Sequence, residues 1–133
     1  MITDSDKQFL ELFAKCSLGS ACWTHAAHVR IAWLILETSD SFDIALERLR
    51  AAIQKFNSSN NSIGYHETIT VAFATVIASR RRRGQVSWAE FSQANSDLFD
   101  KTCLKNHYSS GLLATADAKA TFVPADLEQL PCV

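Results

Sequence analysis

The chain has 133 residues, of which 47% are hydrophobic and 20% are charged, with four glycines and two prolines. A chain of this length can bury a sizeable core in one domain, and the scarcity of glycine and proline argues against a turn-rich β architecture. The formal net charge of −1 excludes a general attraction to nucleic acid or anionic lipid. The stretch Met1–Asp6 lacks a secretory pattern, and the longest apolar run, Ile31–Leu36, is too short to span a bilayer. We therefore expect a cytoplasmic protein without a membrane partner.

The first half of the chain shows the hydrophobic spacing of three helices. The first is predicted over 4–18, after the capping residues Asp4-Ser5-Asp6 and before Gly19-Ser20. Thr24 is a suitable N-cap for a second helix over 25–37, whose two adjacent apolar stripes predict a central position. A third helix is predicted over 42–57, and the polar run over 57–64 predicts a loop.

The second half of the chain predicts shorter helices and a tail. A fourth helix is predicted over 65–82 and a fifth over 87–94, where Ser87 and Glu90 form a capping-box pattern. Further short helices are predicted over 97–104 and 115–122, and prolines leave 123–133 as an extended tail on the surface. The predicted fold is all-α: a single domain over 1–133, built as a helical bundle of about five to six helices with an irregular C-terminal tail.

Two short segments at predicted helix starts carry three of the four histidines. His25 and His28 lie in the first turn of the second helix, three residues apart and therefore on one face. His66 and Glu67 lie at the start of the fourth helix. If the second, third and fourth helices run up, down and up, both starts lie at the same end of the bundle. We therefore predict that these four side chains meet there.

Three imidazoles and a carboxylate form a suitable ligand set for a divalent transition metal such as Zn, Ni, Fe or Mn. The predicted metal ligands are His25, His28 and His66, and Glu67 is the predicted catalytic residue, as a fourth ligand or a general base. A metal with an open position activates water or polarises a substrate oxygen. The first hypothesis is therefore a metal-dependent hydrolase or oxidoreductase that acts on a small-molecule substrate.

The same residues also fit functions without catalysis. Helix N-termini favour anions over cations, so Arg30 and the histidines could instead hold phosphate or carboxylate. The alternative hypothesis is a non-enzymatic module that binds a small anionic ligand or a protein partner. His107 is either a further member of the site or a surface loop residue. The run Arg80–Arg83 is interpreted as a solvated helix end, which makes nucleic-acid binding a minor alternative.

The segments His25–Trp33 and Tyr65–Thr70, with the later elements Asn95–Asp100 and Tyr108–Ser110, resemble an uncharacterised family of small bacterial all-helical proteins. The resemblance covers residues 23–131 and is most specific in the two histidine segments. Family members tend to carry Asn-Pro-Asp-Leu where this chain has Asn95-Ser96-Asp97-Leu98, so the proline is absent here. The resemblance implies an all-helical fold and a role for His25, His28, His66 and Glu67, but it implies no particular reaction.

Overall fold

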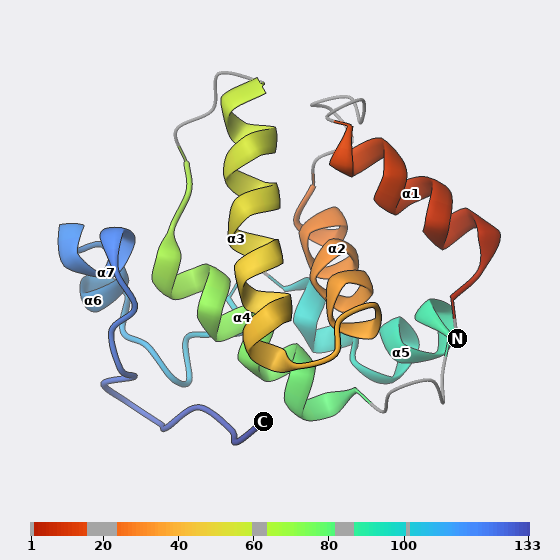
Figure 1. Ribbon diagram of the computed structural model, residues 1–133. Coiled ribbons are helices and arrows are strands. Elements are labelled where there is room, and N and C mark those ends of the chain that lie inside the picture. The colour runs from red at the N-terminus through yellow and green to blue at the C-terminus, as the bar shows by residue number, and fades with distance from the viewer. Residues whose placement is uncertain (1, 16–23, 60–63, 82–86, 101) are drawn as a thin grey trace.

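The computed structural model describes residues 2–15, 24–59, 64–81, 87–100 and 102–133. Within these ranges the fold is all-helical and no residue lies in a strand, which confirms the predicted fold class (Figure 1). No helix found there is long and apolar enough to cross a membrane. The helices are α1 (Asp4–Ala14), α2 (His25–Glu37), α3 (Phe42–Ser59), α4 (Glu67–Arg80), α5 (Trp88–Ala94), the 3-10 helix η2 (Ser96–Phe99), α6 (Ser110–Leu113) and α7 (Ala116–Ala120).

Side-chain caps begin several of the helices at the places that the sequence predicts. The Thr24 hydroxyl accepts a hydrogen bond from the backbone N–H of Ala27 at the start of α2. Ser87 and Glu90 form the expected capping box at the start of α5, and Thr115 caps α7. Because each cap satisfies a backbone N–H that has no partner within its helix, these residues fix where the helices begin.

Some helix boundaries differ from the prediction. The fourth helix begins at Glu67 rather than Tyr65, because His66 is its N-cap. The prediction of a helix over 97–104 was wrong, since η2 is followed by turns. The Asp100 carboxylate accepts hydrogen bonds from the backbone N–H and the hydroxyl of Thr102, which offers the backbone a local alternative to a helix. The predicted ends of the first and fourth helices, at 18 and 82, lie outside the described residues.

Helix α2 lies at the centre of the molecule and contacts α1, α3 and α4. Trp33 is fully buried, with its ring 5.5 Å from that of Trp88 and 6.0 Å from that of Phe91, so α5 is anchored on α2. Burial of apolar surface is the main favourable term in folding, and α2 provides much of it. The buried residues of α2 are Ala27, Val29, Ile31, Ala32, Trp33, Leu34, Ile35 and Leu36.

The three long helices α2, α3 and α4 alternate in direction. In Figure 1, α2 and α4 both run downward from about the middle of the view, and α3 runs upward. All three pairs are in contact, so they form a three-helix core in which α2 and α4 are parallel. The predicted cluster of histidines assumed this alternation of helix directions.

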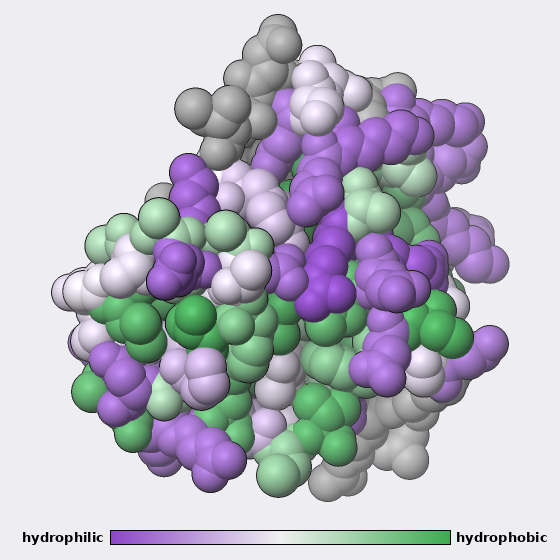
Figure 2. Space-filling view, turned by 60° about the vertical axis from the view of Figure 1, so that its left-hand side comes forward, coloured by the Kyte–Doolittle hydropathy of each residue, from purple (hydrophilic) through white to green (hydrophobic). Residues whose placement is uncertain are grey.

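The chain after α7 contains no helix and is bonded to the body of the protein. The Thr68 hydroxyl of α4 donates to the Thr121 carbonyl and accepts from the backbone N–H of Val123. Exposed apolar side chains lie along this segment at Phe122, Leu127 and Val133. Figure 2, which turns the α6–α7 side of the molecule forward, shows hydrophobic side chains over much of the lower half of that face. Hydrophilic side chains lie above them and to the right, and also interrupt them at the lower left.

Candidate ligand pocket

A pocket of about 660 Å³ opens between α2, α3 and α4. Most of the wall is aliphatic or aromatic, and the polar groups are two hydroxyls and two imidazoles. No lysine, arginine, aspartate or glutamate among the described residues lines it. The lining residues are Thr24, His25, Ala26, His28, Val29, Ala32, Leu49, Ile53, Ile69, Thr70, Phe73 and Ile77.

His25 is fixed between three elements at one wall of this pocket. Its Nε2 atom donates to the carbonyl of Leu98 in η2 at 2.8 Å. The imidazole also meets the Phe73 ring of α4 edge-on, with 5.2 Å between the ring centroids. These contacts hold the ring in one orientation, as a preorganised binding site requires.

His28 lies one turn further along α2 on the same wall. Its Nδ1 atom donates to the Thr24 carbonyl at 2.7 Å. Burial lowers the pKa of His28 below the ordinary value, and the nearby His25 lowers it further, against the opposing effect of the Thr24 hydrogen bond. Because burial disfavours the charged form, His28 is neutral near pH 7.

The two carbonyl contacts assign the tautomers of these histidines. A nitrogen that donates to a carbonyl carries the proton, so neutral His25 is protonated at Nε2 and neutral His28 at Nδ1. The unprotonated nitrogens are therefore Nδ1 of His25 and Nε2 of His28. Such a nitrogen can accept a hydrogen bond, take up a proton or bind a metal.

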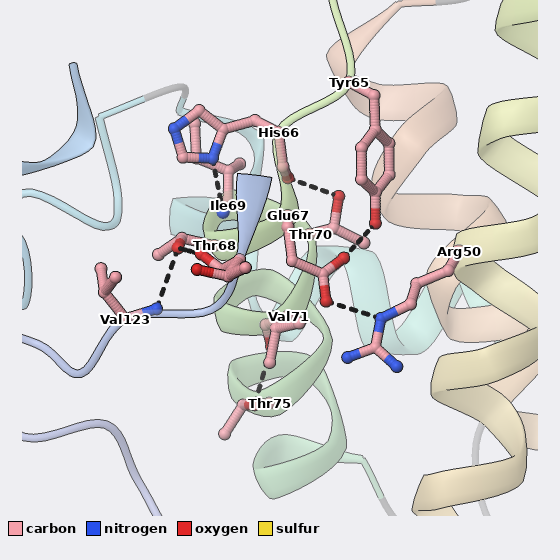
Figure 3. Close-up of polar contacts among 11 residues, drawn as sticks. Arg50, Tyr65, His66, Glu67, Thr68, Ile69, Thr70, Val71, Thr75 and Val123 are labelled. Atoms are coloured by element: carbon pink, nitrogen blue, oxygen red, sulfur yellow. Dashed lines mark hydrogen bonds and ion pairs between the residues drawn. The ribbon is translucent and has the colours of Figure 1, made fainter. Parts of the chain in front are cut away.

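His66 has a different role, because both of its ring nitrogens bond to the backbone. Its Nδ1 atom accepts a hydrogen bond from the N–H of Ile69 at 3.1 Å and thereby caps α4 (Figure 3). Its Nε2 atom donates to the Leu113 carbonyl of α6 at 2.8 Å. A nitrogen that already accepts a hydrogen bond has no lone pair left for a metal, so this geometry makes His66 a structural residue.

Glu67 is held by an ion pair and a hydrogen bond. Its carboxylate accepts from Nε of Arg50 on α3 at 2.7 Å and from the hydroxyl of Tyr65 at 2.5 Å (Figure 3). Burial and this interaction with Glu67 raise the pKa of Tyr65 to about 12. The tyrosine therefore stays protonated at neutral pH and donates a hydrogen bond to Glu67. The three side chains tie α3 to the start of α4.

The stagger of α2 against α4 separates His66 from the other two histidines. His25 contacts Phe73, which follows His66 by seven residues, and at 1.5 Å per residue this offset is about 10 Å along α4. Accordingly, His66 does not line the pocket, and the described residues contain no group of three or more His, Cys, Asp or Glu that could hold a metal ion. The structure thus brings together His25 and His28, but not His66 or Glu67, in this pocket.

The remaining candidate residues that the sequence suggested do not line this pocket where the structure describes them. Arg30 pairs with Asp6 at 2.7 Å and stacks on the Phe9 ring, which links α1 to α2. The Nδ1 atom of His107 donates to the Glu128 carbonyl at 2.9 Å, in the C-terminal segment. Arg80 and Arg81 pair with acidic side chains of η2 and α2, while Arg82 and Arg83 lie outside the described residues.

The pocket walls are the functional feature that the sequence did not reveal. The apolar residues Ile53, Phe73 and Ile77 recur at helical spacing, which turns them inward. Periodicity identifies an inward face, but it does not say whether the opposing faces touch. That distinction depends on side-chain volumes in three helices at once, which a single sequence does not encode in a local pattern.

Comparison with known protein families, with curated proteins and with solved structures finds no significant match. The resemblance to a small bacterial all-helical family therefore stays a prediction.

Proposed function

We propose that this protein binds a small, largely apolar molecule in the pocket between α2, α3 and α4, with a polar group of the ligand facing His25 and His28. The observation that carries this proposal is a concave space of about 660 Å³ with apolar walls and few polar groups. Ligand sites in proteins typically have this size and this composition. The proposal develops the alternative hypothesis from the sequence, a module that binds a small ligand.

The arrangement of the polar groups supports an oriented ligand. His25 and His28 lie on one helix and are both held by backbone carbonyls, while Leu49 and Ile53 of α3 supply apolar wall. A ligand with an apolar body and one polar end can therefore match both sides of the pocket. Burial of the apolar body supplies about 25 cal/mol per Å² of area removed from water.

A pocket-filling variant tests this function. Ala32 of α2 is buried in the wall, so Ala32→Leu places additional volume inside the pocket. We expect the variant to fold and to lose at least tenfold in affinity for a short-chain alkyl ligand such as 1-octanol, measured by calorimetry. The matched control is Ala51→Leu on the exposed side of α3, which should bind as the wild type does. Undetectable binding of every alkyl probe to the wild type would contradict the proposal.

A second candidate function is favoured by one specific observation. Histidines that bind a metal commonly donate their other N–H to a backbone carbonyl, and His25 and His28 both do so. A divalent ion such as Zn, Ni, Fe or Mn bound by these two rings would keep open positions for water or substrate, as the metal-dependent hydrolase or oxidoreductase hypothesis requires. Neither His66 nor Glu67 is needed for this version of the site.

Elemental analysis of untagged protein tests the second candidate. It predicts about one transition metal per chain, with loss of the metal in His25→Ala, His28→Ala and retention of the metal in His66→Asn, which keeps the α4 cap. Metal-free protein that binds no added Zn, Ni, Fe or Mn would exclude this candidate and would leave the ligand pocket as the proposed function.

A further inference from the structure

We infer that the ligand of this pocket is an apolar alcohol whose hydroxyl donates a hydrogen bond to Nδ1 of His25, and that Thr70 disfavours ligands without such a hydrogen. This inference rests on the proposed function and names the class of its ligand. The two side chains belong to different helices, α2 and α4, and both line the pocket. In each of them the polar hydrogen already bonds to a backbone carbonyl, so each presents a lone pair to a ligand.

The Leu98 carbonyl fixes which nitrogen of His25 can meet a ligand. The Nε2 atom donates to this carbonyl at 2.8 Å, and Leu98 belongs to η2 and does not line the pocket. Within the part of the chain that the structure describes, Nδ1 of His25 has no hydrogen-bond partner. A neutral imidazole has one donor nitrogen and one acceptor nitrogen. The nitrogen left for a ligand is therefore the acceptor.

Thr70 presents an acceptor for a related reason. Its hydroxyl donates to the His66 carbonyl at 2.9 Å (Figure 3). The neighbouring Tyr65 hydroxyl also interacts with Thr70, but the hydrogen of Tyr65 goes to the Glu67 carboxylate. Because a threonine hydroxyl has a single hydrogen, the Thr70 oxygen has only lone pairs to offer to the pocket.

The two acceptors lie close to each other between α2 and α4. The His25 ring meets the Phe73 ring with 5.2 Å between the centroids. Thr70 precedes Phe73 by three residues, so it lies on the same face of α4, about 4.5 Å along the helix axis. A ligand oxygen without a hydrogen would face lone pairs in an apolar space, which is unfavourable. The remaining wall hydroxyl, that of Thr24, is on an exposed residue and can donate to water.

Calorimetry at about pH 8 with 1-octanol and its isomer 1-methoxyheptane tests the inference. The two probes contain the same atoms, but only the alcohol has a hydrogen to donate. We expect 1-octanol to bind roughly tenfold or more tightly than the ether, because the ether leaves a partly buried acceptor unpaired. Equal affinities would overturn the inference and leave the pocket function standing. If neither probe binds, the proposed function itself fails.

Two matched valine variants test the role of Thr70. Thr70→Val keeps the shape of the side chain and removes its oxygen, so the ether should gain affinity and the preference for the alcohol should shrink. Thr75→Val is the control, because the Thr75 hydroxyl donates to the Val71 carbonyl within α4 and Thr75 does not line the pocket. Its preference should equal that of the wild type. If both variants change the preference equally, Thr70 does not select the ligand.

Nitrogen-15 spectra of histidine-labelled protein test the contact with His25 directly. Saturating 1-octanol should move the Nδ1 resonance of His25, because this nitrogen gains a hydrogen bond. The Nε2 resonance should stay nearly in place, since its bond to Leu98 persists. The ether should move Nδ1 much less. An Nδ1 resonance that saturating 1-octanol leaves in place would overturn the inference.

Discussion

A histidine at the start of a helix can be a cap or a pocket residue, and the atoms around its ring decide which. His66 uses Nδ1 to accept the Ile69 N–H and Nε2 to donate to Leu113. His25 and His28 each bond one carbonyl and line an apolar pocket. The sequence showed that all three begin helices. The sequence could not show which ring nitrogens bond to the backbone, because the partner carbonyls of Leu98 and Leu113 are distant in the chain.

Because His66 caps α4 and does not line the pocket, its replacement should lower the stability of the fold without changing ligand affinity. His66→Ala should lower the free energy of unfolding by about 1 kcal/mol, because the Ile69 N–H loses its acceptor. His66→Asn should cost less, since asparagine is a good N-cap. Urea denaturation measures both values. Equal stability of the alanine variant and the wild type would contradict the role assigned to this ring.

At the scale of the helices, the sequence predicted which segments are helical. It did not predict how neighbouring helices are offset along their axes. Periodicity and caps located α2, α3 and α5 closely, because both signals are local. The predicted meeting of His66 with His25 depended on the stagger of α2 against α4. That stagger is set by packing between distant residues such as His25 and Phe73, so no local pattern reports it.

The link between α4 and the C-terminal segment gives a prediction at this scale. Thr68 is fully buried and its hydroxyl bonds both Thr121 and Val123. Thr68→Val keeps the shape but leaves two backbone groups unpaired, which should cost about 1 to 3 kcal/mol. Hydrogen exchange at the Val123 amide should rise markedly.

The matched control for this change is Thr75→Val on the same helix. The Thr75 hydroxyl donates only to the Val71 carbonyl, within α4, so its removal leaves no distant backbone group unpaired. Exchange at Val123 should be as slow as in the wild type. If both variants raise exchange equally, the hydroxyl of Thr68 is not what holds the segment.

For the whole molecule, the half-buried His28 links stability to pH. Burial lowers the pKa of His28 in the folded protein, so the unfolded chain binds a proton first as the pH falls. The stability that neutral His28 allows is therefore complete above about pH 6.5, the ordinary value, and is lost as the pH falls from there toward the folded pKa. Thermal unfolding between about pH 5 and pH 7 should show this slope, and His28→Gln should flatten it. An unchanged slope in the variant would assign the effect to other groups.

At the scale of the whole molecule, we propose that the three-helix core leaves a ligand space between α2, α3 and α4. The measurement that tests this claim most directly is an isotope-filtered nuclear Overhauser experiment between 1-octanol and methyl-labelled protein. We expect transfer from the alkyl chain to the methyl groups of Leu49, Ile53 and Ile77, and none to the exposed Ile44 on α3. Transfer only to surface methyls, such as those of Leu127 and Val133, would contradict it.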